Sequence, residues 1–287
     1  MTDKYAVIGN PIAHSKSPLI HQMFAAQTRQ NISYEAILAP LDGFAATVER
    51  LRDEGYKGCN VTVPFKFEAL QLATRVEPLA GIAKAVNTLK FADDEIMGYN
   101  TDGIGLTADL QFNLEINLKN KRVLLVGAGG AASGVVHSLA YQGARVTVVN
   151  RNMEKAQLLA KAFVFANKLP TPQLPFPANS GRIDALGYAD LADQEFDIII
   201  NATSAGLMDE MPNIPKTIFA PGVLAYDMMY GRETPFMKFA REHGAAVVVD
   251  GLGMLVEQAA ESFRIWRNVR PDTRPVLKKL RAELPIA

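Results

Sequence analysis

The chain has 287 residues, a length typical of one large domain or two ordinary domains with a sizeable buried core. Its 30 lysines and arginines balance its 30 aspartates and glutamates, and 48% of the residues are hydrophobic. This composition is typical of a globular protein and argues against nucleic acid as the main partner. Cys59 is the one cysteine, no apolar run reaches the roughly 20 residues that span a bilayer, and the first residues lack a signal-peptide pattern. We therefore expect a soluble cytoplasmic protein without internal disulfides or membrane contacts.

Short apolar strands and helices alternate along the first hundred residues. Ser17 followed by Pro18 is typical of a helix start, with serine as N-cap and proline at the first helical position. The hydrophobic pattern predicts strands over 5–8, 32–38 and 58–63, helices over about 18–28 and 43–53, further helices near 65 and 79–85, and a hairpin over 88–100. Such alternation predicts an α/β fold with a mostly parallel sheet and right-handed crossovers.

The alternation continues through the second half of the chain. A strand over 122–126, a glycine-rich turn over 127–130, a helix over 131–142 and a strand over 145–149 form the clearest βαβ unit. The helix expected over 253–266 has an apolar stripe, and Gln258 lies beside that stripe, where its polar end could reach a neighbouring cleft. Further strands are expected at 196–201, 224–227 and 245–250, and a proline-rich surface loop at 168–182.

The glycine-rich turn fits the fingerprint of dinucleotide-binding proteins. Residues 127–132 read GAGGAA, which is G-x-G-x-x-A between a strand and a helix. In this pattern Gly127 permits the tight turn, Gly129 lets a pyrophosphate approach the backbone, and Ala132 is small enough for the helix to pack on the strand. The free N–H groups at the start of the helix would bind the phosphates. The alternative is a glycine-rich turn that serves only packing.

The end of the next strand bears on the choice between NAD and NADP. NAD sites usually place a carboxylate here to bind the ribose 2′-hydroxyl, but this strand is followed by Asn150, Arg151 and Asn152. Arg151 and Lys155, about one helical turn later, favour the 2′-phosphate of NADP. The alternative is an ordinary solvated arginine, and the nearby Glu154 could weaken the preference.

Short polar motifs follow several of the strands expected in the first hundred residues. They comprise Ser15 and Ser17, Asn60 and Thr62, Lys66, Asn87 and Thr88, and residues 100–103. Ligands of open α/β sheets bind at the carboxyl ends of strands, and hydroxyl and amide side chains there suit a polyhydroxylated substrate. Each motif alone is typical of a cap or a turn, but their joint placement indicates a substrate site.

A series of short motifs extends from the N-terminus to the last long helix. They read GNPIAHSKSP (9–18), NVTVPFK (60–66), AVNTL (85–89), NTDG (100–103), VGAGGAA (126–132), NR (150–151), INATSAG (200–206), YDMMY (226–230) and DGLGMLVEQA (250–259). In this order they resemble the shikimate dehydrogenase family over nearly the full length of the chain. The resemblance implies NADP-linked, reversible conversion of 3-dehydroshikimate to shikimate in aromatic amino-acid biosynthesis.

The resemblance also implies roles for the matched residues. Lys66 and Asp102 would be the catalytic pair. Ser15 and Ser17 would bind the substrate carboxylate, Tyr230 would contact the substrate, and the residues that bind ring hydroxyls or orient the pair would be Asn60, Thr62, Asn87 and Gln258. The cofactor contacts would be Gly127, Ala128, Gly129, Gly130, Ala131, Asn150, Arg151, Asn152, Lys155, Met228 and Gly251. The chain departs from the family pattern at Asn152, where many members have threonine, and at Lys155, where many have arginine.

The chemistry of ketone reduction requires a proton donor or a cation at the carbonyl oxygen, where negative charge builds up. No histidine lies inside a matched catalytic motif, and lysine can fill this role when its surroundings alter its pKa. We expect Lys66 to donate the proton in reduction and accept it in oxidation, with Asp102 holding the ammonium. The alternative is that Lys66 acts electrostatically while a water or Asp102 handles the proton. No clustered metal-ligand pattern is present in the sequence, so no metal is expected.

We expect two domains with a cleft between them. The N-terminal α/β substrate domain would cover 1–103 and 252–287, and a Rossmann-like NADP-binding domain would cover 104–251; the chain could act as a monomer or a homodimer. The nearest alternative is a quinate/shikimate dehydrogenase with looser substrate or cofactor choice. The pocket near Ser15, Thr62 and Tyr230 would decide whether quinate is accepted as well as shikimate. A non-catalytic sensor of NADP and a metabolite is a further alternative, against which the presence of both Lys66 and Asp102 argues.

Overall fold

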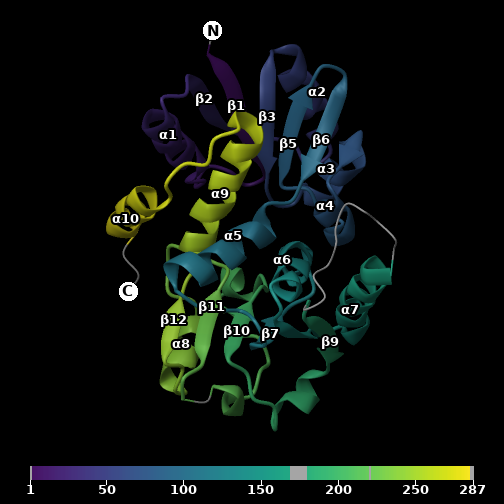
Figure 1. Ribbon diagram of the computed structural model, residues 1–287, viewed down its shortest axis with the longest axis vertical. Coiled ribbons are helices and arrows are strands. Elements are labelled where there is room, and N and C mark those ends of the chain that lie inside the picture. Colours follow the sequence, from purple (N-terminus) through teal and green to yellow (C-terminus); the bar gives the residue numbers. More distant parts are fainter. Residues whose placement is uncertain (1, 169–179, 220, 285–287) are drawn as a thin grey trace.

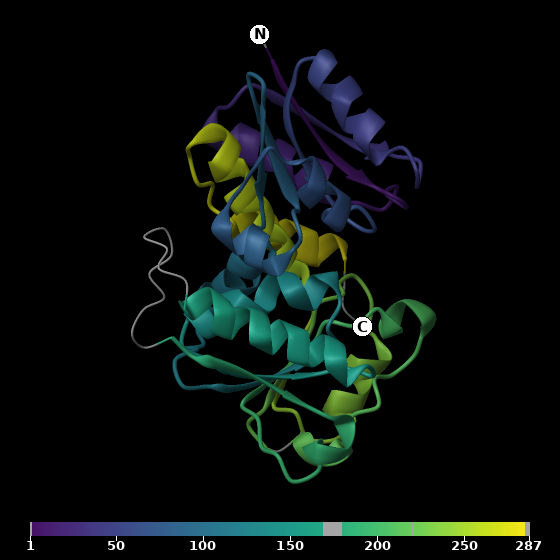
Figure 2. The ribbon, with the colours of Figure 1, turned by 90° about the vertical axis from the view of Figure 1, so that its right-hand side faces the viewer.

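The computed structural model describes residues 2–168, 180–219 and 221–284, which form two α/β halves, each built on its own six-stranded sheet (Figure 1). The two sheets lie one above the other along the long axis, and the view turned by 90° shows the same separation (Figure 2). No helix within the described residues is both long and apolar enough to cross a membrane.

The first sheet has the strand order β2-β1-β3-β5-β6-β4. Strands β1, β2 and β3 are mutually parallel, whereas β5 runs antiparallel to both of its neighbours because it forms a hairpin with β6. The hairpin that was expected over 88–100 is present, and its turn contains Asp93 with a φ of 49°. The strands are β1 (Asp3–Gly9), β2 (Ile32–Leu38), β3 (Tyr56–Val61), β4 (Arg75–Val76), β5 (Thr88–Ala92) and β6 (Glu95–Tyr99).

Four short helices connect these strands, namely α1 (Ser17–Thr28), α2 (Phe44–Asp53), α3 (Lys66–Leu72) and α4 (Pro78–Ala83). A core that includes Phe44, Phe65 and Leu89 packs against one face of the sheet, and Phe44 stacks on Phe65 at a centroid distance of 5.0 Å. A second cluster, with Ile20 and Phe263, joins α1 to a helix from the C-terminal part of the chain. Phe65 directly precedes α3, so its burial against Phe44 fixes the start of this helix and therefore the position of Lys66.

The second sheet is parallel throughout, with the order β12-β11-β10-β7-β8-β9. Numbered from its first strand, this is the 3-2-1-4-5-6 order of doubly wound dinucleotide-binding domains. Its strands are β7 (Arg122–Val126), β8 (Arg145–Val149), β9 (Arg182–Leu186), β10 (Ile198–Asn201), β11 (Leu224–Asp227) and β12 (Val247–Val249). Its helices are α6 (Gly130–Tyr141), α7 (Met153–Lys168) and α8 (Pro235–Glu242), with 3-10 turns η2 (Tyr188–Leu191), η3 (Ala205–Met208) and η4 (Lys216–Ile218).

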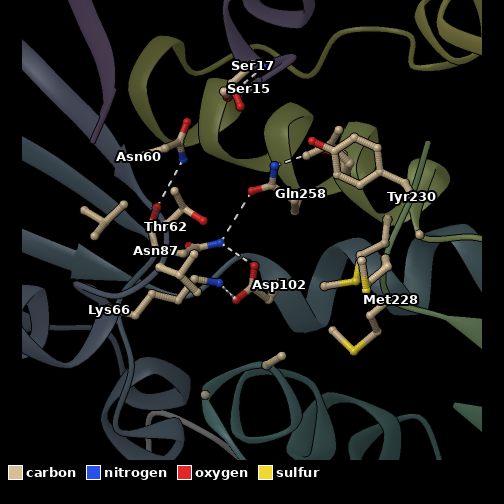
Figure 3. A pocket seen from close by; sticks show the side chains of 18 of the residues that line it. Ser15, Ser17, Asn60, Thr62, Lys66, Asn87, Asp102, Met228, Tyr230 and Gln258 are labelled. Atoms are coloured by element: carbon tan, nitrogen blue, oxygen red, sulfur yellow. Dashed lines mark hydrogen bonds and ion pairs between the residues drawn. The ribbon is translucent and has the colours of Figure 1, made fainter. Parts of the chain in front are cut away.

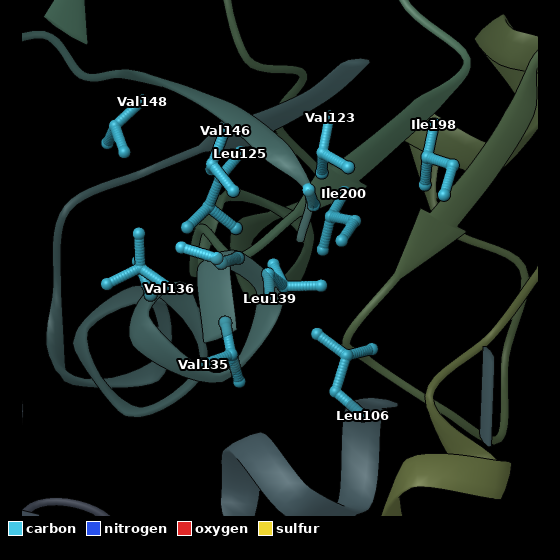
Figure 4. Packing of buried hydrophobic residues seen from close by; sticks show 14 of the residues in the cluster. Leu106, Val123, Leu125, Val135, Val136, Leu139, Val146, Val148, Ile198 and Ile200 are labelled. Atoms are coloured by element: carbon cyan, nitrogen blue, oxygen red, sulfur yellow. The ribbon is translucent and has the colours of Figure 1, made fainter. Parts of the chain in front are cut away.

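This half has a hydrophobic cluster on each face of its sheet, and one of them lies between the sheet and helix α6 (Figure 4). Branched side chains from the parallel strands, such as Val123 and Ile200, meet Val135 and Leu139 of α6, and all four are fully buried. Leu106, from the helix that enters this half, closes the same cluster. Near-continuous apolar strands are expected where both faces of a parallel sheet are covered.

The two halves are connected by helices α5 (Asp102–Ala108) and α9 (Leu252–Arg267), which pack side by side (Figure 1). Helix α5 continues as a π-helical turn, η1 (Asp109–Asn113), and α9 is followed by α10 (Arg274–Glu283). A Cβ on Gly105 would lie 2.6 Å from the Cβ of Gln258, so only glycine permits this close crossing. The crossing brings Asp102 and Gln258 to the same place between the sheets.

Most expected elements are present within one or two residues, and the differences are local. The predicted surface loop over 168–182 falls largely on residues 169–179, which lie outside the described residues, and its last residue, Arg182, already belongs to β9. The sequence patterns did not predict helices α5, α7, α8 and α10, strand β9 or the two-residue strand β4.

Candidate active site

A cavity of about 600 Å³ lies between the two halves and is lined by residues of both (Figure 3). From the first half come Ser15, Asn60 and Lys66, which follow or end strands of the first sheet; from the second half come Gly129 and Met228. Carboxyl ends of strands in both sheets therefore open into one cavity, which is where open α/β sheets bind their ligands.

Lys66 and Asp102 form an ion pair at this cavity. The distance from Lys66 Nζ to Asp102 Oδ2 is 2.5 Å, and the side chains are 19% and 8% exposed. Each is the first residue of its helix, α3 and α5, so the pair joins two elements 36 residues apart in the sequence. The ammonium has three N–H groups and Asp102 needs only one of them, so donors remain for a ligand.

Asn87 holds the carboxylate of Asp102 in place. The backbone N–H of Thr101 donates to Asn87 Oδ1 at 2.9 Å, which fixes the orientation of the amide because a backbone N–H can only donate. The Asn87 Nδ2 group therefore faces Asp102 and donates to its Oδ1 at 2.8 Å. Of the two roles expected for Asn87, this geometry supports the orientation of the pair.

The other expected substrate residues line the same cavity. Gln258 Oε1 accepts from Thr101 Oγ1 at 3.3 Å and Asn87 Nδ2 at 3.4 Å, while its Nε2 donates to the carbonyl of Leu255 at 2.9 Å (Figure 3). Burial raises the pKa of the Tyr230 phenol, so its hydroxyl stays neutral. The cavity brings together Ser15, Ser17, Asn60, Thr62, Lys66, Asn87, Asp102, Tyr230 and Gln258.

The glycine-rich turn between β7 and α6 forms the facing wall. Gly127 has a φ of +110°, and a Cβ there would lie 3.1 Å from the carbonyl oxygen of Ala202, so the tight turn requires glycine. A Cβ on Gly129 would point into open space with no atom within 4 Å. No side chain caps the N-terminus of α6. Open backbone beside an uncapped helix N-terminus fits the pyrophosphate of a dinucleotide.

The tip of β8 has two exposed cations and no carboxylate. Asn150, Arg151 and Asn152 follow the strand, and Asn152 Oδ1 accepts from the backbone N–H of Lys155 at 3.3 Å, which caps the start of α7. Asn150 Nδ2 donates to the carbonyl of Asn152 at 2.9 Å. Arg151 and Lys155 are exposed, an arrangement that fits a 2′-phosphate.

The expected cofactor residues divide into two groups. Those beside the ion pair line the cavity: Gly129, Gly130, Ala131, Met228 and Gly251. The remainder lie outside its lining, at the glycine turn and the tip of the adjacent strand: Gly127, Ala128, Asn150, Arg151, Asn152 and Lys155. An extended ligand that reached both groups would run across the ends of β7 and β8.

The polar run after β10 also reaches the cavity, although no role was expected for it. Thr203 and Ser204 of this run are among the lining residues, as is Met229, which follows β11. Asn201 Oδ1 accepts from the backbone N–H and the hydroxyl of Thr203, at 3.1 and 2.7 Å, which fixes the turn. The signal was available in the INATSAG motif, where polar residues follow an apolar strand.

The 3-2-1-4-5-6 sheet, the open glycine turn and the lysine–aspartate pair that faces it define a dinucleotide-dependent oxidoreductase. Three family models match successive parts of the chain: shikimate dehydrogenase substrate binding domain (7–89), shikimate / quinate 5-dehydrogenase (108–208) and shikimate 5'-dehydrogenase C-terminal domain (251–281). A shikimate dehydrogenase (NADP(+)) from Methylobacillus flagellatus is 55% identical over 98% of this chain and 99% of its own length. The chain therefore belongs to the shikimate dehydrogenase family.

Solved structures agree with this assignment. An Ael1 enzyme from Pseudomonas putida is 45% identical, with a TM-score of 0.87, over 97% of this chain and 98% of its own. Shikimate 5-dehydrogenase from Thermus thermophilus, solved in complex with NADP(H) and shikimate, is 30% identical, with a TM-score of 0.83, over 99% of this chain and 100% of its own. The expected two-domain α/β fold with a Rossmann-like half is confirmed by these neighbours and by the sheet order.

Proposed function

We propose that the protein catalyses the NADP-dependent, reversible reduction of 3-dehydroshikimate to shikimate, a step of aromatic amino-acid biosynthesis. The observation that carries the proposal is the Lys66–Asp102 ion pair in a cavity shared with the glycine-rich turn. The family membership supports it, because the Methylobacillus relative is named as an NADP+ enzyme and the Thermus relative binds both NADP(H) and shikimate.

In this proposal NADPH supplies the hydride, and the protein controls the proton. Lys66 Nζ donates a proton to the carbonyl oxygen as negative charge develops there, and accepts it back in the oxidation of shikimate. Asp102 holds the ammonium through the 2.5 Å contact, and Asn87 holds Asp102. The alternative, in which Lys66 provides only charge and a water or Asp102 moves the proton, uses the same contacts and is separated by experiment below.

The walls of the cavity supply the substrate contacts of the proposal. Ser15 and Ser17, at the start of α1, bind the carboxylate, with the Ser17 backbone N–H already donating to Ser15 Oγ at 3.3 Å. The residues that bind ring hydroxyls or orient the catalytic pair are Asn60, Thr62, Asn87 and Gln258, and Tyr230 contacts the substrate.

The cofactor contacts follow the second sheet. The backbone of residues 127–131 binds the pyrophosphate, and Arg151, with Asn150, Asn152 and Lys155 around it, binds the 2′-phosphate. Met228 and Gly251 line the same cavity as the ion pair, so they would hold the reacting end of the cofactor there.

Two alternatives come from the same site. A quinate/shikimate dehydrogenase needs room for one more hydroxyl near Ser15, Thr62 and Tyr230. A non-catalytic sensor has no need of a lysine and an aspartate paired at 2.5 Å, so the ion pair favours an enzyme over a sensor.

A single assay tests the proposed function and these alternatives together. The purified protein is incubated with shikimate or quinate, each with NADP+ or NAD+, and the absorbance of the reduced cofactor is followed. The expected result is turnover of shikimate with NADP+ and much slower turnover in the other three combinations. Comparable rates with quinate support the broader enzyme, and no turnover in any combination, with binding retained, supports the sensor.

The remaining features of the proposal concern the whole chain. We place the substrate domain at 1–103 and 252–287 and the cofactor domain at 104–251. With these bounds the chain passes from one domain to the other near the start of α5 and again at the start of α9. We also propose that the protein works in the cytoplasm, as a monomer or a homodimer, on a small-molecule substrate. Light scattering of the purified protein measures its oligomeric state directly.

A further inference from the structure

Tyr34 in strand β2 lies behind the substrate cavity and is not one of its lining residues. Its hydroxyl donates to Asn60 Oδ1 at 2.7 Å. Its ring stacks on His21 of α1 with a centroid distance of 4.1 Å and an interplanar angle of 8°. Burial raises the pKa of the Tyr34 phenol well above its usual value, so the hydroxyl keeps its proton and can donate it.

The orientation of the Asn60 amide is set by the protein. Its Nδ2 lies 3.2 Å from the backbone carbonyl of Asn87, which can only accept, and 3.0 Å from both Thr88 Oγ1 and Ser262 Oγ. Both N–H groups of Asn60 are therefore used inside the protein. Its Oδ1 accepts from Tyr34, so Asn60, which lines the cavity, has no free N–H group left to donate to a ligand.

Tyr34 also interacts with the side chain of Ser17, which lowers the pKa of its phenol against the larger effect of burial. Ser17 is the first residue of α1, whereas Asn60 is near the end of β3, and both line the cavity. The 2.7 Å hydrogen bond ties the Tyr34 hydroxyl to Asn60, on the wall that was assigned to the ring hydroxyls.

We propose that Tyr34 is a positioning residue for the substrate, which holds the side chain of Asn60 in its orientation at the cavity wall. The proposal rests on the proposed function of this cavity. It predicts that the site selects ligands with a ring hydroxyl that can donate to Asn60, because an acceptor there would face the Asn60 oxygen without a proton between them.

Tyr34→Phe is the test, because it removes the hydroxyl and leaves the ring and its stacking on His21. We expect the KM and Kd for shikimate to rise about three- to tenfold, which is the usual worth of one hydrogen bond. The kcat should stay within about twofold and the KM for NADP should not change, because Tyr34 touches neither the ion pair nor the glycine turn. The ratio of the Kd for ring-deoxy analogues to the Kd for shikimate should become smaller in the variant.

Tyr5→Phe is the matched control. Tyr5 is the register partner of Tyr34 on β1, is buried, and stacks on Trp266, but its hydroxyl contacts Arg267 at 3.4 Å instead of the substrate walls. We expect its shikimate KM to equal that of the wild type. Ser262→Ala removes a partner of Asn60 from the other side of the amide and should raise the shikimate KM in the same direction.

The outcomes separate this proposal from the proposed function. If the wild type does not oxidise shikimate, the proposed function fails and the role of Tyr34 fails with it. If the wild type is active but Tyr34→Phe and Ser262→Ala keep its shikimate KM and analogue discrimination, and change only the thermal midpoint, Tyr34 and Ser262 are structural and the positioning role is wrong. A raised KM in Tyr5→Phe of the same size also overturns it, since general loosening of the sheet would then explain the effect.

Discussion

At the residue scale, the site depends on one ammonium held by one carboxylate. The side chain of Lys66 is 19% exposed, and its ammonium lies 2.5 Å from the carboxylate of Asp102, which is itself held by Asn87. Because the ammonium and the carboxylate are both held in place, neither has to move when negative charge develops on a substrate oxygen. The geometry is therefore suited to proton transfer and to charge stabilisation, and only substitution can separate the two.

Lys66→Arg distinguishes these roles, because arginine keeps the positive charge but has a pKa too high to release a proton readily. If Lys66 is the proton donor, kcat for shikimate should fall by about 10²- to 10⁴-fold in Lys66→Arg, as in Lys66→Ala. Lys57→Ala, at an exposed lysine of β3, serves as the control and should leave kcat unchanged. Near-normal turnover in Lys66→Arg would support the electrostatic role instead.

Arg151 is the residue that should decide the cofactor preference. Replacing Arg151 by alanine removes a charge-assisted contact with the 2′-phosphate, so the KM for NADP should rise about tenfold or more while the KM for NAD changes little. Arg145→Ala is the matched control, because Arg145 is also exposed and lies at the opposite end of the same strand. Equal losses for both cofactors would contradict the assignment of Arg151.

At the element scale, the turn between β7 and α6 and the crossing of α5 with α9 build the site. The turn was predictable because its glycines and its flanking strand and helix are local features of the sequence. Helix α5 was not, because Asp102–Ala108 contains two glycines and lacks an apolar stripe. Its stability comes from packing on α9 and α6, where a Cβ on Gly103 would lie 2.1 Å from Ser138 Oγ.

Two other missed helices carried local signals. Thr234 before Pro235 is an N-cap with proline at the next position, and the structure confirms that its side chain accepts from the backbone N–H of Met237. Pro275 occupies the corresponding start of α10. Strand β4 has only two residues and pairs with β6 alone, so no periodic pattern could have revealed it.

Gly129→Ala tests the phosphate role of the glycine turn separately from its stability. Gly129 has a φ of −89°, which alanine adopts freely, and its Cβ would meet no atom within 4 Å. The thermal midpoint should therefore stay close to that of the wild type, while the Kd for NADP rises about tenfold or more because the methyl group occupies the space for the pyrophosphate. The control is Gly81→Ala in α4, and an unchanged Kd in Gly129→Ala would argue that the turn serves only packing.

At the scale of the whole molecule, each half has a buried histidine in its core. His21 and His137 are 0% and 2% exposed, and burial lowers their pKa values to about 3 and about 4. Between these values and the ordinary pKa near 6.5, the unfolded chain binds protons at these positions that the folded chain does not. Their contribution to stability is therefore complete above about pH 6.5 and is lost progressively as the pH falls.

His137→Leu measures this effect away from the active site. Between pH 7 and pH 5.5 the free energy of unfolding of the wild type should fall by about 1 kcal/mol for each of the two histidines. His137→Leu keeps only His21, so this histidine-dependent fall should be about half as large in the variant. Buried carboxyls with raised pKa values, including Asp109 and Asp227, act in the opposite direction, so the difference between the two proteins is the informative quantity. The measurement is urea unfolding at both pH values. Equal pH dependence in the two proteins would contradict a neutral, buried His137.

The sequence by itself determined the features that depend on neighbouring residues: the glycine turn, the absence of a carboxylate after β8, and the polar motifs at strand ends. Only the tertiary structure decided which side chains meet. Lys66 and Asp102 are 36 residues apart, and Asn60 meets Ser262 across 202 residues. The physical reason is that turn and capping preferences act over a few residues, whereas a hydrogen-bond partner is set by the packing of whole elements. The role proposed for Tyr34 depends on tertiary packing, because no sequence pattern in β2 distinguishes Tyr34 from Tyr5 in β1.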